Sequence, residues 1–261
     1  NIRAKRSPPG LRPQHETAVT ALARMSNADV EGLKVGSTSL EFTPKGPEGG
    51  SFFFDTGTAG SVSLILQSLI PVMALSKGRS YVEIQGGTNN PFAPPAEYIE
   101  DVLLPTISGM GVTASVQLVR RGFYPKGGGL VKAAVEPVKQ LKPTTLTEFK
   151  KVREVTGLAY SSRLPRHIVE RMAENARKTL EDDGYERVDI ALECLQPKDR
   201  KCAIDPGTGI ILLARLLPKG VVGSDSLGEV GKPAERVGWE AASTLIKQLA
   251  TSSPVDKFLG D

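Results

Sequence analysis

Three similar units follow one another in the first half of the chain, and this repeat limits the possible folds more than any other feature. Each unit is an amphipathic helix followed by one or two strands, and Val62, Ile65 and Leu66 show the helical spacing. We expect helices at 16–25, 61–75 and 96–110, and strands at 33–35, 40–43, 81–85, 113–118 and 129–135. Helices that alternate with strands predict a layered α/β fold.

The pattern changes beyond Pro143. We expect helices at 168–182 and 234–249, and strands at 154–160, 187–195 and 210–216. A polar loop at 196–209 separates the last two strands. Such a set of elements is large enough for a second α/β domain. Residues 252–261 look like the start of a further element.

Composition restricts the class of protein further. The chain has 261 residues, of which 39% are hydrophobic and 24% charged, and these values are typical of a globular fold. The net charge of +4 permits an anionic partner, although a solvated surface explains it more simply. The first residue is not methionine, so we expect a fragment.

The cysteines indicate the compartment. Cys194 and Cys202 are too few for a disulfide framework, so we expect a reducing compartment, nucleus or cytoplasm. Two cysteines and two histidines make a structural zinc site improbable. No apolar run approaches the roughly 20 residues of a membrane span, and no signal peptide precedes the first residue. We therefore expect a soluble protein without a membrane partner.

The N-terminal segment has the first motif that suggests chemistry. Arg3 and Arg6 are two of four cations in the first twelve residues, and Gln14 and His15 follow at a helix start. Guanidinium groups and helix N-termini both suit phosphate oxygens. On this segment alone, a basic surface strand with a turn is the simpler interpretation.

A second motif joins a loop of small residues, 55–61, to the helix that contains Gln67. Small residues before a helix let the backbone approach an anion closely. No Gly-Lys-Thr sequence follows, so the loop is not a Walker motif. Glycine and serine also simply begin helices, which leaves this signal weak.

A third motif occupies residues 86–98, where Pro94 and Tyr98 lie a few residues apart at a helix start. They fit two roles equally well: the walls of a flat pocket for a base, or a staple that caps the helix.

A fourth motif runs from Arg121 to three successive glycines, 127–129. Glycine weakens a strand, so three of them indicate a sharp bend or a close backbone approach. The alternative is a hairpin turn with a bulge.

Together these motifs resemble the RNA 3′-terminal phosphate cyclase family. The sequence Arg-Gly-Phe-Tyr-Pro-x-Gly-Gly-Gly at 121–129 closely resembles that family's signature, and the other three motifs have its order and spacing. The resemblance implies an α/β (α+β) fold. Its large domain consists of repeated helix–strand units, similar to the C-terminal domain of translation initiation factor three, and it has a smaller inserted α/β domain. We place the large domain at 1–147 and 251–261 and the insert at 148–250.

The resemblance also implies a reaction. Family members use ATP to convert an RNA 3′-phosphate into a 2′,3′-cyclic phosphate. A histidine is adenylylated first, the adenylate moves to the RNA phosphate, and the 2′-hydroxyl then displaces AMP. The implied cofactors are ATP and a divalent metal, Mg or Mn, and the implied partner is RNA with a 3′-phosphate end. The sequence does not give the oligomeric state or the metal ligands.

The family's functional positions can be matched to this sequence one by one. The phosphate and RNA-end positions are Arg3, Arg6, Gln14, His15 and Arg121. The ATP positions are Gln67, Pro94, Tyr98, Phe258 and Asp261. Pro94, Tyr98 and Phe258 match positions that line the adenine, and Asp261 matches a ribose or adenylate contact. Arg121 is the least direct assignment, because the arginine and glycines of a signature can serve folding.

The chain departs from the family pattern at both ends. The family's nucleophilic histidine lies in a segment beyond residue 261, and its glycine-rich first segment lies before residue 1. His15 matches the phosphate pocket, and His167 is more simply structural. We therefore expect a chain that is incomplete for catalysis. The alternatives are a catalytically inactive relative in ribosome assembly or RNA binding, and a nucleotide-binding enzyme without RNA.

Overall fold

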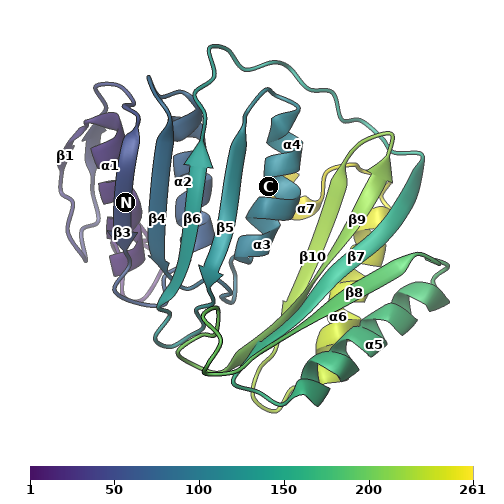
Figure 1. Cartoon of the computed structure of the whole chain (residues 1–261). Coiled ribbons are helices and arrows are strands. Elements are labelled where there is room, and N and C mark those ends of the chain that lie inside the picture. The colour runs from purple at the N-terminus through teal and green to yellow at the C-terminus, as the bar shows by residue number, and fades with distance from the viewer. Residues whose placement is uncertain (261) are drawn as a thin grey trace.

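Two four-stranded sheets lie side by side in the computed structural model, which describes residues 1–260 (Figure 1). The first sheet has the order β3-β4-β6-β5 and the second β10-β9-β7-β8. The strands of the first sheet are β3 (Gly50–Asp55), β4 (Ser80–Gly86), β5 (Ala114–Arg120) and β6 (Gly129–Val135). Those of the second are β7 (Lys151–Ser162), β8 (Val188–Leu195), β9 (Gly207–Leu217) and β10 (Val221–Leu227). The α/β fold class is thereby confirmed. The domain boundaries stay a prediction.

Helices α1 (Pro13–Ser26) and α2 (Val62–Ala74) cover one face of the first sheet. Helix α2 begins where Ser61 accepts a hydrogen bond from the Leu64 N–H, at 3.3 Å. Its buried residues include Ile65, Leu66 and Leu69, which pack with strand residues in one core. Burial of a Leu or Ile side chain stabilises a fold by about 1.5–3 kcal/mol. The predicted helical spacing is therefore what forms this layer.

The second sheet is buried on both faces at strand β9. Ile210, Leu212 and Ala214 pack against helices α5 (Arg166–Asp182) and α6 (Ala234–Leu249) on one face. Ile211 and Leu213 alternate with them and face the other way. Side chains alternate between the two faces of a strand. The continuous apolar run at 210–216 therefore contributes side chains to the hydrophobic cores on both faces of the sheet.

The other face of the second sheet receives the helix between the sheets. This helix is composed of α3 (Ala96–Tyr98), η1 (Ile99–Leu103), a π-helical turn, and α4 (Leu104–Ser108). Tyr98 and Val102 pack onto Ile211 and Leu213. Gly223 of β10 permits the contact, because a Cβ there would lie 2.8 Å from Val102. The single helix expected at 96–110 thus contains a π turn, which its apolar spacing did not indicate.

One expected strand is wrong, and two further strands were not predicted. No strand forms at 33–35; the short strand β1 (Asp29–Glu31) pairs instead with β2 (Glu41–Thr43). Gly32 and Gly36 have positive φ angles of 76° and 86°, so this stretch turns rather than extends. Strands β3 and β10 were not expected. Polar residues interrupt β10, and β3 directly follows a turn sequence.

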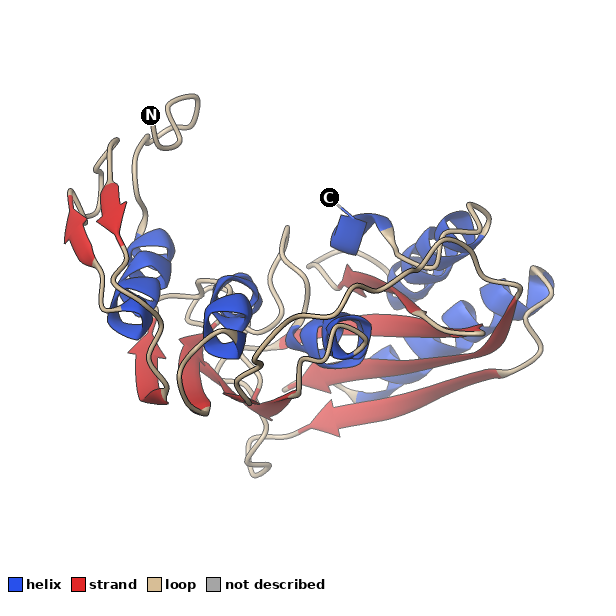
Figure 2. Ribbon diagram, turned by 90° about the horizontal axis from the view of Figure 1, so that it is seen from above, coloured by secondary structure: helices blue, strands red, loops and turns tan. Residues whose placement is uncertain are grey.

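The two ends of the chain lie on one side of the molecule. Figure 2 shows the N-terminal segment and helix α7 (Lys257–Gly260) on the helix-covered side of the first sheet. Asp256 ties the C-terminal segment there, since its carboxylate accepts hydrogen bonds from the Tyr98 hydroxyl at 2.5 Å and the Gly223 N–H at 2.8 Å. Across residues 1–260, no helix combines the length and apolar character needed to cross a membrane.

Candidate functional site

Two adjoining cavities open on this helix-covered side. The larger cavity, of about 520 Å³, is lined by four of the predicted ATP-binding residues: Gln67, Pro94, Tyr98 and Phe258. The smaller cavity, of about 460 Å³, is lined by Gln14 and His15 among others. Leu64 and the loop 90–93 line both cavities. The structure therefore brings two groups of residues, far apart in the sequence, to neighbouring places.

The start of α1 forms one wall of the smaller cavity. The Arg12 backbone N–H donates to His15 Nδ1 at 3.1 Å, which closes the first turn of the helix. Gly60 lets the loop before α2 come close, because a Cβ there would lie 2.6 Å from the Cβ of Gln14. The second motif thus contributes a close packing position beside the predicted phosphate residues.

Electrostatics around His15 suit an anion. Burial lowers the pKa of His15 below its ordinary 6.5, and the positive charges of Arg3 and Arg12 lower it further. The imidazole is therefore neutral near pH 7. Its Nδ1 accepts a hydrogen bond, so Nε2 carries the proton and can donate it. The smaller cavity thus has an N–H donor in His15, and the positive charges of Arg3 and Arg12 act on it from outside the lining.

Arg3 and Arg6 lie in the loop that precedes α1 and line neither cavity. Arg3 has a φ of 51°, and its Nη1 donates to the carbonyl oxygens of Pro8 and Gly10, both at 3.0 Å. Arg6 is exposed. The structure brings the charge of Arg3 near His15 and leaves Arg6 outside the smaller cavity.

In the larger cavity, Phe258 presents a ring more openly than Tyr98 does. Tyr98 is only 3% exposed, whereas Phe258 is 44% exposed. The two rings meet edge to face, with centroids 6.4 Å apart. Pro94 is held because its carbonyl oxygen accepts from the Ser63 hydroxyl. Tyr98 therefore supports Phe258, and Pro94 and Phe258 are the surfaces open to a flat ligand. Asp261 lies outside the described residues.

Asp225 also lines the larger cavity, and no sequence motif predicted it. It sits on β10, the strand that the apolar pattern missed. Burial, together with the negative charge of Glu97, raises the pKa of Asp225 to about 6. Its position inside an otherwise buried strand is the only signal that marks it.

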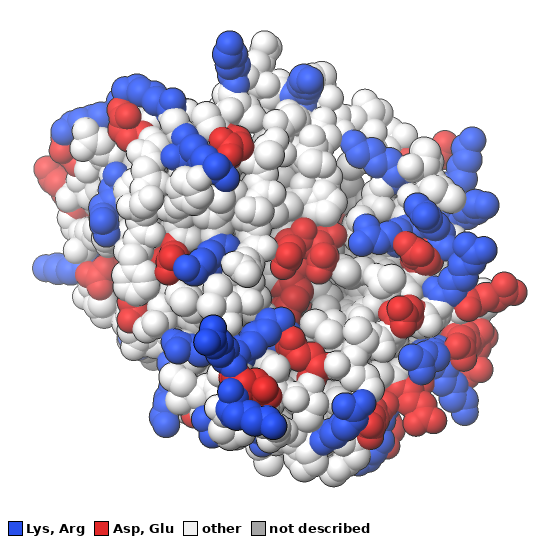
Figure 3. Space-filling model, in the orientation of Figure 1, with Lys and Arg blue, Asp and Glu red and all other residues white. Residues whose placement is uncertain are grey.

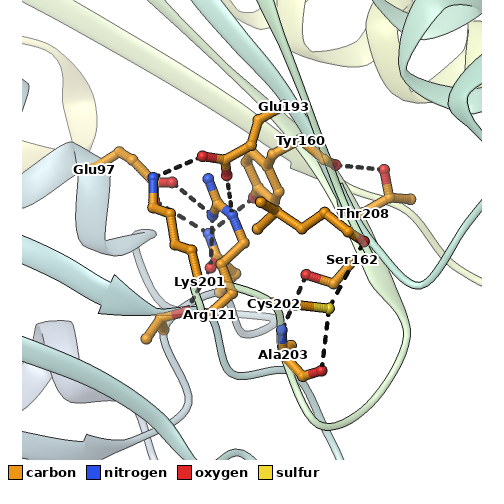
Figure 4. A network of polar contacts seen from close by, with 12 residues as sticks. Glu97, Arg121, Tyr160, Ser162, Glu193, Lys201, Cys202, Ala203 and Thr208 are labelled. Carbon is orange, nitrogen blue, oxygen red and sulfur yellow. Dashed lines mark hydrogen bonds and ion pairs between the residues drawn. The ribbon is translucent and has the colours of Figure 1, made fainter. Parts of the chain in front are cut away.

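Arg121 has a different place from the one expected. Its side chain is 0% exposed, and it pairs with Glu97 through Nη1 and with Glu193 through Nε, both at 2.6 Å (Figure 4). The guanidinium carbon lies 3.9 Å from the ring centre of Tyr160. The assignment of Arg121 to the RNA end is therefore corrected: its guanidinium is enclosed between the two sheets and cannot reach a phosphate.

The glycines of the same motif allow backbones to pass closely. A Cβ on Gly122 would lie 2.4 Å from the backbone N of Gly129. Gly127 has a φ of +69°, and its Cβ would lie 2.7 Å from Ala59 Cα. The chain also turns here, through a bridge between Phe123 and Gly127. Both interpretations of the glycines, close approach and turn, apply to this segment.

The face seen in Figure 1 is unlike the cavities. Figure 3 shows acidic side chains gathered near its centre, between the two sheets. Within residues 1–260, no three His, Cys, Asp or Glu side chains are placed to hold a metal ion. The side chains of the described residues therefore do not by themselves form a metal centre, and the divalent metal stays a prediction. Mg²⁺ usually takes ligands from water and substrate phosphates.

His167 lines neither of these two cavities. It lines a third one, of about 470 Å³, beside the first turns of α5 and α6, which shares Glu229 and Lys232 with the larger cavity. This position agrees with a structural interpretation and gives His167 no contact with the predicted nucleotide or phosphate residues.

Comparison with known proteins gives a consistent result. The family model for RNA 3′-terminal phosphate cyclase matches residues 1–261. The proteins of that name from Desulfurococcus amylolyticus and Ignicoccus hospitalis are each 45% identical to this chain, and that from Hyperthermus butylicus is 46% identical. Each match covers 100% of this chain and 73% of the relative.

These matches run over the whole of this chain and 73% of each relative, and the expectation that the chain is incomplete for catalysis stays a prediction. The relatives are archaeal and give no specific support to a nuclear location. The glycine-rich signature, the neighbouring cavities and the match over all 261 residues agree. The chain belongs to the RNA 3′-terminal phosphate cyclase family.

Proposed function

We propose that this protein uses ATP to convert an RNA 3′-terminal phosphate into a 2′,3′-cyclic phosphate. The observation that carries the proposal is the pair of adjoining cavities, one with exposed flat side chains and one lined by a neutral His15 that feels the nearby charges of Arg3 and Arg12. An adenylate in the larger cavity and an RNA end in the smaller one would meet at the loop 90–93, which lines both.

The chemistry needs two ligands in contact. A phosphomonoester is a poor electrophile, and transfer of AMP to it supplies a leaving group. A histidine nitrogen attacks the α-phosphorus of ATP and releases pyrophosphate; the RNA 3′-phosphate then attacks that phosphorus and frees the histidine. The 2′-hydroxyl oxygen attacks the RNA phosphorus, loses its proton and expels AMP. Positioning and charge neutralisation are the protein's main contributions.

The larger cavity binds the nucleotide in this scheme. Pro94 and Phe258 contact the adenine, Tyr98 holds Phe258 in place, and Gln67 binds a polar group of the nucleotide. Asp261 stays the predicted ribose or adenylate contact.

In the smaller cavity, Gln14 and His15 bind the RNA phosphate, with His15 donating from Nε2. Arg3 and Arg6 supply positive charge at its approach.

We assign the nucleophile to a histidine other than His15 and His167, which the resemblance puts beyond residue 261. His15 has Nδ1 occupied by the Arg12 N–H, and His167 lines a different cavity. The predicted divalent metal would neutralise the nucleotide phosphates.

Two assays test the proposal. RNA with a 3′-phosphate is incubated with ATP, Mg²⁺ and a form of the protein extended past residue 261, and its end should become resistant to phosphatase as the cyclic phosphate forms. In parallel, α-labelled ATP should leave label on a form of the protein extended past residue 261, and His15→Ala and His167→Ala should both keep that label. Binding of both ligands without label or resistant ends would favour the catalytically inactive relative.

A further inference from the structure

We propose that Phe92 and Tyr124 form a stacking surface for the last nucleobases of a single-stranded RNA whose 3′-phosphate lies at Gln14 and His15. The inference rests on the proposed function and adds a part of the substrate that no predicted residue contacts. Both aromatic side chains line the smaller cavity together with Gln14 and His15.

The exposure of these rings is the first observation. Phe92 is fully exposed and Tyr124 is 75% exposed, although large apolar side chains are ordinarily buried. An exposed aromatic ring beside a polar pocket is typical of proteins that bind single-stranded nucleic acid, because every base has a face that can stack.

The backbone of Phe92 is the second observation. Its φ is 63°, in the left-handed region that bulky residues rarely adopt. Residues in such conformations persist where the surroundings hold them, and they concentrate at ligand-binding sites. Phe92 therefore combines an unfavourable backbone conformation with an exposed apolar ring, and this ring does not pack in the core.

The loop around Phe92 is held firmly on both sides. Asn90 Nδ2 donates to the carbonyl oxygen of Ala59 at 2.6 Å, and the Ser63 hydroxyl donates to that of Pro94. Gly87 leaves room for Asn90, whose amide would lie 2.3 Å from a Cβ at that position. The ring of Phe92 thus projects from a fixed loop, which lowers the entropy cost of binding a base.

Tyr124 is presented by a second fixed turn. The Gly127 N–H donates to the carbonyl oxygen of Phe123 at 2.8 Å, and the Lys126 N–H donates to Asp205 at 2.9 Å. Gly127 packs against Ala59, the residue whose carbonyl oxygen also holds the Phe92 loop. The glycine-rich signature therefore places an aromatic ring at the same cavity, a role separate from that of the buried Arg121.

The position of the two rings selects the ligand. Both rings line the smaller cavity with the predicted phosphate residues; Tyr124 lines that cavity alone, whereas Phe92, in the loop 90–93, also lines the larger one. A base next to the terminal phosphate would therefore lie against Tyr124 and against Phe92 at the boundary between the two cavities. Stacking uses the flat face that every base has. We therefore expect the protein to bind RNA with unpaired 3′ ends more tightly than RNA with paired ends, and to bind different terminal bases with similar affinity.

The test measures affinity by fluorescence anisotropy at one fixed salt concentration. The probe is a 5′-labelled RNA octamer with a 3′-phosphate, compared with the same RNA lacking its two 3′-terminal bases. Phe92→Ala and Tyr124→Ala should each weaken binding of the intact RNA by about 5- to 150-fold and change binding of the abasic RNA far less. Phe92→Trp and Tyr124→Phe should keep affinity.

Phe53→Ala is the matched control, since Phe53 is an exposed aromatic on β3 that lines neither cavity. Unchanged affinity of both alanine variants for the intact RNA, or equal losses on the intact and abasic RNA, would overturn the inference. A 3′-hydroxyl version separates it from the proposed function. If phosphate and hydroxyl ends bind alike, the proposed function fails, while the effect of removing the bases still reports on stacking.

Discussion

Arg121→Met is expected to destabilise the protein without acting on the RNA end directly. The substitution keeps an unbranched apolar side chain and removes the positive charge that Glu97 and Glu193 share. The Glu97 and Glu193 side chains are only 8% and 18% exposed, so water cannot replace the lost partner fully. Breaking a buried ion pair from one side costs about 3–5 kcal/mol, a large part of the 5–15 kcal/mol that stabilises a typical domain.

Urea denaturation followed by circular dichroism measures this loss. Arg166→Met is the matched control, because Arg166 pairs with Glu170 on the surface at 2.7 Å and such pairs contribute about 0–1 kcal/mol. Adding Glu97→Gln and Glu193→Gln to Arg121→Met should restore part of the stability, since neutral amides carry no uncompensated charge. An Arg121→Met protein as stable as the parent but weakened for 3′-phosphorylated RNA would refute the structural role.

Four further outcomes are expected. Asp225→Asn should raise the free energy of unfolding by up to roughly 3 kcal/mol near pH 8, because folding raises the pKa of Asp225 from 3.8 to about 6. This gain in stability should vanish as the pH falls towards 4. A gain that does not depend on pH would contradict the burial of an ionised Asp225. Arg3→Met should raise the pKa of His15 in an NMR titration, since the substitution removes a nearby positive charge. An unchanged pKa would mean that the charge of Arg3 does not act on His15. Phe258→Ala should weaken ATP binding about tenfold, equivalent to the roughly 1.4 kcal/mol of one aromatic contact, and unchanged calorimetric affinity would remove it from the base site. His167→Ala should leave ATP binding intact, and a loss would link the third cavity to the nucleotide.

The spacing of apolar residues predicted most of the helices and strands, because the residues so spaced are the ones that become buried. The strand Gly129–Val135 and the helix Ala234–Leu249 have the bounds that their apolar spacing indicates. β10 was not predicted because Ser224 and Asp225 interrupt its apolar residues, although tertiary structure buries Ser224 in this strand. Ser224, for example, donates to the carbonyl oxygen of Ala241 at 2.8 Å, a partner that local sequence cannot reveal.

The candidate site was predictable where its residues belong to local motifs. Gln67 and Pro94 belong to such motifs, whereas Phe258 was assigned only through the family resemblance, and the structure places all three on one cavity. Arg121 belongs to an equally clear motif, but its partner Glu193 is 72 residues away, so its burial depends on how the two sheets meet. The conformation of Phe92 could not be predicted either, since an aromatic residue in a loop does not indicate a φ of 63°.

The most direct test of the two-cavity account is calorimetric titration of this chain with two RNAs that differ only in a 3′-phosphate or 3′-hydroxyl end. We expect the phosphate end to bind more tightly by about tenfold or more, the effect of a charge-assisted hydrogen bond. Gln14→Ala should reduce that difference, while Phe258→Ala and the exposed control Gln117→Ala should leave it in place. Equal affinity for both ends by the folded protein would contradict the assignment of the smaller cavity to the RNA phosphate.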